Sequence, residues 1–153
     1  MLLVDARKLA DELIAKHLPD RGWYFEFDLA RRRFGCTHYG TKQITLSKVL
    51  TKLNDEERVR NTILHEIAHV LTGKGNGHNY KWTSTALEIG CDGKRCYDST
   101  MVATPEPHYA GTCPNCGRVV KRYRRSAIAC GQCCRALNHG RYSAEYKLTW
   151  ARV

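Results

Sequence analysis

Two histidines four residues apart, with a glutamate directly after the first, form the most chemically informative pattern in the sequence, His65-Glu66-Ile67-Ala68-His69. In an α-helix, residues four apart lie on one face about one turn from each other, so both imidazoles can bind one metal ion. Glu66 lies about 100° further round the helix, beside the metal rather than on it. The pattern predicts a zinc centre in which Glu66 is the general base that takes a proton from a zinc-bound water.

A catalytic zinc site usually has three protein ligands and one open position. The predicted third ligand is His78, which follows the glycine-rich loop 73–77 and begins the next predicted helix. Glu88 on that helix is the alternative ligand. The two lie ten residues apart, which is about 15 Å along a helix, so both cannot bind the same ion. We expect His78, with the indole of Trp82 one turn further on packing behind its imidazole.

The sequence has eight cysteines, and four of them form two Cys-x-x-Cys pairs, Cys113 with Cys116 and Cys130 with Cys133. Each pair can supply two thiolates to one tetrahedral zinc ion, and a site with four cysteine ligands is closed and therefore structural. Cys134 could compete with its neighbour, but the two-residue spacing favours Cys133. The sequence therefore predicts two zinc ions, one catalytic and one structural.

The positive charge is concentrated in the last third of the chain. Residues 1–104 carry 16 basic and 13 acidic side chains, whereas residues 105–153 carry nine basic and two acidic ones. A field of this sign favours a polyanion, and nucleic acid is the expected partner. The alternative is a solvated basic surface with no partner. The predicted nucleic-acid contacts lie between the two cysteine pairs: Arg118, Lys121, Arg122, Tyr123, Arg124 and Arg125.

The helix that carries the two histidines is predicted to begin at Asn54 as its N-cap and to end near Leu71, before Gly73. Acidic residues in its first turn suit the helix dipole. Its apolar residues fall opposite the histidine face, so the helix is expected to bury one side in the core and turn the other towards a cleft. These apolar residues are Val59, Ile63, Leu64, Ile67, Val70 and Leu71.

The remaining patterns predict an α+β fold. Helical spacing indicates helices over residues 5–18 and 78–89, and aromatic and β-branched runs within residues 23–46 indicate a small antiparallel sheet. A proline-containing segment follows, so we expect a metal-binding domain over residues 1–104 and a small β zinc ribbon over residues 105–153. With only 153 residues, a large multidomain enzyme is excluded.

No apolar stretch approaches the roughly 20 residues needed to cross a bilayer. The first residues, Met1-Leu2-Leu3-Val4-Asp5, do not have the pattern of a secretion signal. Cysteines stay reduced in the cytosol, which favours metal binding over disulfides. We therefore expect a cytoplasmic monomer with no membrane partner, associated with the nucleoid, or in the host cytoplasm if the protein is viral.

The sequence resembles the SprT-like metalloproteases, which include the Spartan type. The resemblance rests on the HExxH pattern, Gly77-His78 with Trp82, the terminal cysteine pairs, Arg32-Arg33-Phe34-Gly35 and Ile44-Thr45-Leu46-Ser47. It implies a minimal zincin-like protease domain followed by a zinc ribbon. Spartan-type members degrade proteins covalently trapped on DNA and are activated by DNA.

We therefore expect a zinc-dependent endopeptidase, activated by DNA with single-stranded features, that cleaves DNA-bound or DNA-crosslinked proteins in DNA–protein crosslink repair. The alternative is a non-catalytic, zinc-stabilised nucleic-acid-binding adaptor or regulator. The residue that stabilises the oxyanion stays open among Tyr80, Tyr97 and Arg58.

Overall fold

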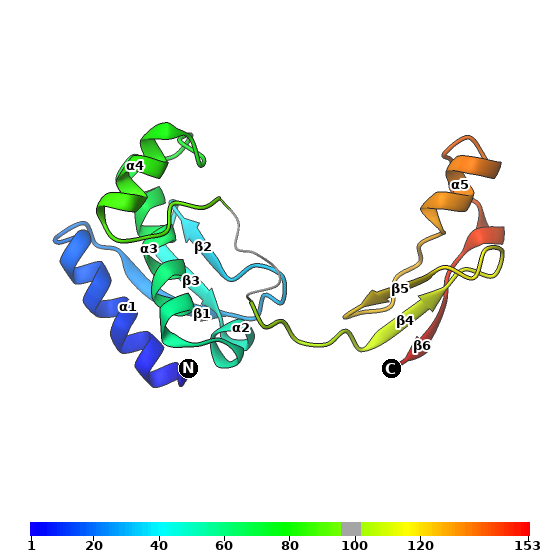
Figure 1. The fold of residues 1–153 in the computed structure, drawn as a ribbon, viewed down its shortest axis with the longest axis horizontal. Coiled ribbons are helices and arrows are strands. Elements are labelled where there is room, and N and C mark those ends of the chain that lie inside the picture. The colour runs from blue at the N-terminus through cyan, green and yellow to red at the C-terminus, as the bar shows by residue number, and fades with distance from the viewer. Residues whose placement is uncertain (96–101) are drawn as a thin grey trace. The chain divides into compact units, whose positions relative to one another are not determined.

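The computed structural model describes residues 1–95 and 102–153, which form two compact units, Met1–Pro105 and Glu106–Val153 (Figure 1). Tyr97, one of the oxyanion candidates, lies outside the described residues. The first unit has an α+β fold, as predicted, with helices and a three-stranded sheet in the order α1 (Leu3–His17), β1 (Tyr24–Asp28), β2 (Gly35–His38), β3 (Gln43–Ser47), α2 (Lys48–Leu53), α3 (Glu56–Thr72) and α4 (Tyr80–Glu88).

The sheet has the order β1-β3-β2, so β2 is an edge strand. It is mixed, because β3 pairs antiparallel with β2 and parallel with β1. The expectation of purely antiparallel pairing was wrong for β1. After β1 the chain crosses to the far edge of the sheet, where it forms β2. The following turn brings β3 back between β1 and β2, parallel to β1. Alternating apolar residues predict the strands but not this crossing.

Helix α3 begins one residue later than expected. Its N-cap is Asp55, whose carboxylate accepts a hydrogen bond from the backbone N–H of Arg58. Asn54 instead joins two segments, because its side-chain amide donates to the carbonyls of Leu50 and Ala103. The helix ends at Gly73, whose φ of 84° favours glycine. The HExxH segment thus lies inside a continuous, capped helix.

The core of this unit lies between the sheet and helices α1 and α3. Val59, Ile63 and Ile67 on α3 are fully buried, as the helical spacing predicted. They pack in one cluster with sheet residues such as Phe25 and Ile44. Burying each large apolar side chain contributes roughly 1.5–3 kcal/mol. The core therefore anchors one side of α3 and leaves His65, His69 and Glu66 on another.

The second unit contains a three-stranded antiparallel sheet in the order β5-β4-β6. Its elements are β4 (Tyr109–Thr112), β5 (Val119–Arg122), α5 (Gly131–Leu137), the 3₁₀ helix η1 (Ala144–Tyr146) and β6 (Thr149–Arg152). Helix α5 was not expected in a β ribbon; it starts within the second cysteine pair. Trp150 packs directly on Gly111, where an added Cβ would lie 2.9 Å from the indole ring.

Helices long and apolar enough to span a bilayer are absent from the described part of the chain.

Candidate active site

Three imidazoles converge at one point. The Nε2 atoms of His65, His69 and His78 lie 3.3, 3.2 and 3.0 Å from one another. A tetrahedral zinc ion with bonds of about 2.0–2.1 Å places its nitrogen ligands about 3.3–3.4 Å apart. Three nitrogens of neutral imidazoles cannot all satisfy one another by hydrogen bonds, because each is either donor or acceptor. The arrangement therefore fits a zinc ion held by these three histidines.

His78 reaches this point from outside α4. The helix begins after Asn79, whose side chain caps it by accepting a hydrogen bond from the N–H of Trp82. The prediction that His78 starts this helix was therefore wrong by two residues, although the residue still meets the other histidines. Glu88, the alternative ligand, is an exposed residue at the far end of α4 and is not part of the cluster.

Trp82 forms the wall behind the metal ligands, as predicted from its spacing. Its side chain is fully buried, and its ring centroid lies 4.6, 5.2 and 4.5 Å from those of His65, His69 and His78. The Tyr39 hydroxyl donates a hydrogen bond of 2.8 Å to the backbone carbonyl of His69. Ligands held this firmly by packing are preorganised for a metal ion.

Burial also sets the protonation of the ligands. It lowers the pKa of His65 to about 4, with the other two histidines acting in the same direction. Burial lowers the pKa of His69 to about 4 as well, and it lowers that of His78. All three imidazoles are therefore neutral near pH 7, which is the form that binds zinc.

Glu66 is buried, with 6% of its surface exposed, on the side of the helix facing β2. The Thr37 hydroxyl lies 2.7 Å from Glu66 Oε2 and 3.1 Å from the Glu66 backbone carbonyl. Burial raises the pKa of Glu66 to about 7, while the Thr37 hydrogen bond and the charge of Arg33 act in the opposite direction. A carboxyl group poised near neutral pH suits proton transfer in both directions.

Gly35 leaves the room that Glu66 occupies. A Cβ added at Gly35 would lie 2.8 Å from Glu66 Oε1, 2.9 Å from its Cγ and 3.0 Å from the Thr62 methyl group. These distances are shorter than normal contacts, so a side chain at this position would displace the carboxylate. Glycine at the start of β2 is therefore part of the site.

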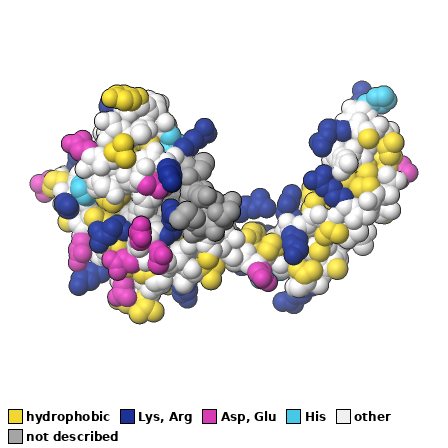
Figure 2. Space-filling model, in the orientation of Figure 1, with side chains coloured by type: hydrophobic (Ala, Val, Ile, Leu, Met, Phe, Trp, Pro, Cys, Tyr) yellow, Lys and Arg dark blue, Asp and Glu magenta, His cyan; other side chains and the backbone are white. Residues whose placement is uncertain are grey.

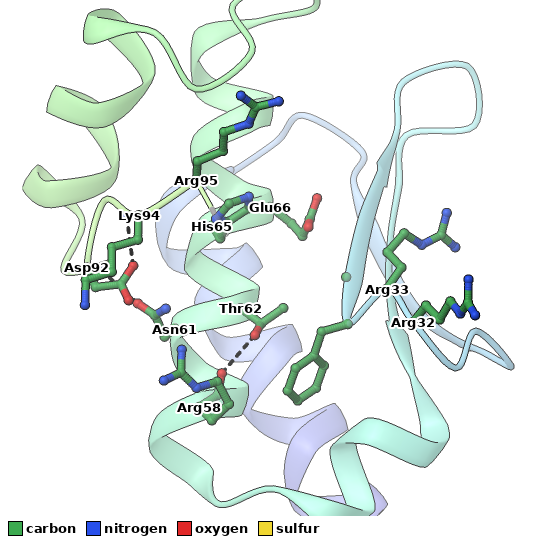
Figure 3. Close-up of a pocket in the computed structure, with 12 residues that line it drawn as sticks. Arg32, Arg33, Arg58, Asn61, Thr62, His65, Glu66, Asp92, Lys94 and Arg95 are labelled. Carbon is green, nitrogen blue, oxygen red and sulfur yellow. Dashed lines mark hydrogen bonds between the residues drawn. The ribbon is translucent and has the colours of Figure 1, made fainter. Parts of the chain in front are cut away.

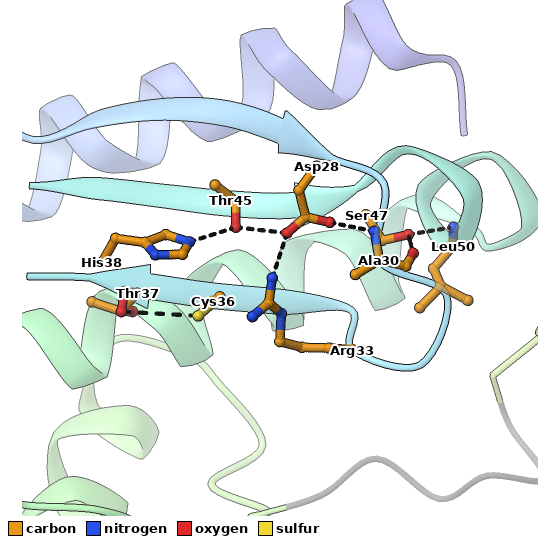
Figure 4. Close-up of polar contacts among 9 residues, drawn as sticks. All are labelled: Asp28, Ala30, Arg33, Cys36, Thr37, His38, Thr45, Ser47 and Leu50. Carbon is orange, nitrogen blue, oxygen red and sulfur yellow. Dashed lines mark hydrogen bonds and ion pairs between the residues drawn. The ribbon is translucent and has the colours of Figure 1, made fainter. Parts of the chain in front are cut away.

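A polar network fixes the segment that leads into Gly35 (Figure 4). The carboxylate of Asp28 accepts hydrogen bonds from the Ala30 N–H at 2.8 Å, from Arg33 at 2.8 Å and from the Thr45 hydroxyl at 2.9 Å. His38 contacts the same Thr45 hydroxyl at 3.2 Å. Burial alone would raise the pKa of Asp28, but these hydrogen bonds outweigh it and lower the pKa below its ordinary value.

A cavity of about 410 Å³ opens beside His65 and Glu66 (Figure 3). Its walls come from α3, from the segment before β2 and from the segment after α4. Arg58, one of the oxyanion candidates, lines it seven residues before His65, about 10 Å along the helix. Tyr80, another candidate, is 88% exposed.

The four paired cysteines also converge. The Sγ atoms of Cys113 and Cys133 lie 3.8 Å apart, as do those of Cys116 and Cys130. A zinc–sulfur bond of about 2.3 Å gives a tetrahedron with edges of about 3.8 Å. The four thiols therefore fit a structural zinc ion, whereas Cys134 is buried outside the cluster.

The residues predicted to contact nucleic acid lie in different surroundings in the structure. Arg118 and Arg122 line a cavity of about 240 Å³ together with Arg135, which the sequence reasoning missed. Arg125 lies 5.1 Å over the ring of Tyr109. The other predicted contacts, Lys121, Tyr123 and Arg124, are exposed or half-buried and do not line this cavity.

Sequence reasoning also missed Thr37, Tyr39 and the role of Gly35. These residues lie on or next to β2, and their contacts with α3 depend on how that strand crosses the helix. The sequence offered one signal, because a glycine at the start of a strand indicates a close approach by another group.

Comparison with known proteins places the chain in a family. The SprT-like family matches residues 6–102, which include all three histidines and Glu66. The metallopeptidase zymogen jannalysin of Methanocaldococcus jannaschii shares 18% identity with a TM-score of 0.49, over 63% of this chain and 86% of that chain. No curated protein matches. The family match covers more than half of the chain and confirms the resemblance: the protein belongs to the SprT-like family and is a zinc metallopeptidase with a three-histidine centre.

Proposed function

We propose that this metallopeptidase is an endopeptidase that nucleic acid activates and that cleaves proteins bound or crosslinked to DNA. The observation that carries the proposal is the presence of a metallopeptidase centre and a strongly basic four-cysteine unit in one chain. The second unit has nine Lys or Arg residues against two Glu residues, a formal charge of +7. DNA bound there would bring attached proteins close to the protease unit.

Zinc bound by the three histidines would polarise a peptide carbonyl and lower the pKa of a water molecule. Glu66 then has two tasks, to accept the proton of the attacking water at a carboxylate oxygen and to return it to the leaving amine. The hydrogen bond from Thr37 to Oε2 holds the carboxylate in one orientation and leaves Oε1 for the proton.

Strand β2 provides a means of holding the substrate. It is an edge strand, and it contacts Glu66 through Thr37. An extended peptide can pair with such an edge through its backbone, which gives affinity without a strict sequence requirement. This mode suits a protease whose substrates share their attachment to DNA rather than a sequence.

The cavity formed by Arg118, Arg122 and Arg135 supports the nucleic-acid part of the proposal. Its lining includes the apolar residues Val120 and Leu148. Guanidinium groups bind phosphates and apolar surfaces accept bases or sugars, so this mixture suits a single strand with unpaired bases. Figure 2 shows further Lys and Arg side chains on the surface of this unit.

A cleavage assay on a basic protein crosslinked to a single-stranded oligonucleotide tests the proposal. We expect the wild type to cleave this substrate much faster than the same protein without DNA, and the difference to shrink as salt increases. Glu66→Gln should abolish cleavage while both zinc ions stay bound. Equal rates with and without DNA would refute activation and leave the peptidase assignment intact.

Ribbon variants separate the two parts of the proposal. Arg118→Gln combined with Arg122→Gln should weaken oligonucleotide binding and reduce DNA-dependent cleavage. Arg141→Gln is the matched control, since Arg141 is an exposed arginine of the same unit outside the cavity. If the loss of binding per charge removed is the same in both variants, total charge rather than the cavity governs binding.

A further inference from the structure

The cavity beside the catalytic glutamate is cationic. Its lining includes five basic residues and two acidic ones, Glu66 and Asp92. Arg33 is paired with Asp28, and the side chains of Arg32 and Arg33 point away from α3 (Figure 3). Within residues 1–95 and 102–153, no ion pair involves Arg58, Lys94 or Arg95. Three cationic residues thus line the cavity without an ion-pair partner in the described chain.

The two acidic residues are already engaged. Glu66 accepts a hydrogen bond from Thr37 and makes no ion pair within the described residues. The Oδ1 atom of Asp92 accepts the backbone N–H of Lys94 at 3.0 Å, which stabilises the turn that carries Lys94 and Arg95. The Asp92 backbone N–H in turn donates to the Asn61 side chain on α3 at 2.8 Å. The turn that carries Lys94 and Arg95 is therefore tied to α3 by hydrogen bonds.

Arg58 lies on the same face of α3 as the metal ligands. Arg58, Thr62 and His65 follow the spacing of one helical stripe, and the Thr62 hydroxyl donates to the Arg58 carbonyl at 2.9 Å. Arg58 and His65 are about 10 Å apart along the axis, and an extended peptide rises about 3.3 Å per residue. A peptide whose scissile bond lies at His65 and Glu66 would therefore bring a side chain within reach of Arg58 about one to three residues away.

We propose that this cavity is a specificity pocket for an acidic side chain of the substrate, with Arg58 as its principal determinant. The inference rests on the peptidase activity of the centre and does not require activation by nucleic acid. A guanidinium group matches the two oxygens of a carboxylate, and the apolar ring of Phe34 and the Thr62 methyl group can cover the methylene groups of Asp or Glu.

A nucleic-acid phosphate is the competing anion. The position of the cavity favours the peptide, because it adjoins Glu66, where the scissile bond must lie. A polynucleotide in the same cavity would block the substrate rather than assist its cleavage. A phosphate-binding cavity therefore predicts that DNA inhibits the cleavage of a short peptide, whereas a pocket for a substrate side chain predicts no such inhibition.

Matched peptides test the pocket. The zinc-loaded protein is first incubated with a mixed peptide library, and the cleaved bonds are identified by mass spectrometry. We expect Asp and Glu to be enriched at one position within three residues of the cleaved bond. Peptides that differ only by Glu, Gln or Lys at that position are then compared, and kcat/KM for Glu should exceed that for Gln by about tenfold.

Substitution of Arg58 distinguishes specificity from a structural role. Arg58→Gln should bring the Glu-to-Gln ratio of kcat/KM close to one, and Arg58→Glu should reverse the preference in favour of Lys. Arg60→Gln is the control, because Arg60 belongs to the same helix, pairs with Glu56 and lies outside the cavity. That control should retain the wild-type ratio.

Several results would overturn the inference. Cleavage without any preference for an acidic side chain would do so and would leave the peptidase intact, whereas no cleavage of any peptide or protein would count against the proposed function itself. Competitive inhibition of peptide cleavage by single-stranded DNA, relieved by Arg58→Gln, would assign the cavity to phosphate. The Glu-to-Gln ratio of kcat/KM is also measured in the triple variant Arg58→Gln, Lys94→Gln and Arg95→Gln. An unchanged ratio in that variant would show that these cationic residues do not recognise the substrate side chain.

Discussion

The Thr37 hydroxyl lies 2.7 Å from Oε2 of Glu66 and links strand β2 to the buried carboxylate on helix α3. The contact joins two segments 29 residues apart in sequence. A carboxylate on a helix can rotate about its side-chain bonds, and this hydrogen bond selects one orientation. Strand β2 thereby positions the carboxylate that we propose as the general base.

Replacing Thr37 with valine keeps the shape of the side chain and removes this hydrogen bond. Hydrogen bonds to charged groups contribute about 1.5–3 kcal/mol, so we expect kcat to fall roughly 10- to 100-fold. Zinc content and KM should change little, because neither depends on the hydroxyl. Thr51→Val is the control: it also removes a buried threonine hydroxyl, but one with no hydrogen-bond partner among the described residues. Equal losses of kcat in both variants would contradict a specific role for Thr37.

Gly35→Ala should displace Glu66 without removing any of its atoms. The new methyl group would come within 2.8 Å of Oε1, so either the carboxylate or the strand must move. A shift of about 1 Å in a catalytic group can cost about 100-fold in rate, and we expect a loss of that order in kcat/KM. Gly40→Ala is the matched control, because no heavy atom lies within 4 Å of a Cβ at that position. Full activity of Gly35→Ala would mean that Glu66 is not held as described.

The two metal sites should be independent. The three histidines lie in the unit Met1–Pro105 and the four cysteines in the unit Glu106–Val153. We expect two zinc ions per chain by elemental analysis, of which His69→Ala removes one and Cys113→Ser the other. Loss of the structural ion should unfold the small second unit, because metal binding supplies much of the folding free energy of such a unit. Loss of both ions in either single variant would disprove this independence.

The sequence was sufficient where chemistry depends on spacing along one element. His65 and His69 are one helical turn apart, and each cysteine pair spans one tight turn, so the ligands could be identified without knowing the rest of the fold. His78 could be identified as the third ligand because only a short glycine-rich loop separates it from the helix that carries the other two. The apolar stripe of α3 was likewise visible, because its period is that of a helix.

The parts that depend on contacts between distant segments could not be predicted in this way. The bond from Thr37 to Glu66 and the fit of Gly35 against Thr62 require the path of β2 across α3. That path follows from the crossover that makes β1 parallel to β3, which alternating polarity does not specify. The cationic cavity beside Glu66 is lined by three separate segments of the chain, so it could not be predicted from the sequence for the same reason.

The last prediction concerns Asp28, which fixes the segment leading to Gly35. Its folded-state pKa is lowered, so its hydrogen bonds to Ala30, Arg33 and Thr45 stabilise the fold above the ordinary pKa of 3.8 and are lost as pH falls through the folded value. Asp28→Asn should lower the free energy of unfolding by about 1–2 kcal/mol at pH 7, because the bonds to a charged acceptor are weakened.

The difference between Asp28→Asn and the wild type should shrink as pH falls from 3.8 through the lower folded-state pKa, because the folded wild-type carboxylate becomes neutral over that range. Urea unfolding followed by near-UV circular dichroism at several pH values measures it. Zinc is lost at low pH from both proteins alike, so the comparison isolates the carboxylate. Asp11→Asn, at an exposed position on α1, is the control variant. A difference that stays constant down to pH 2 would mean that ionisation of the Asp28 carboxyl group does not account for its stabilising effect.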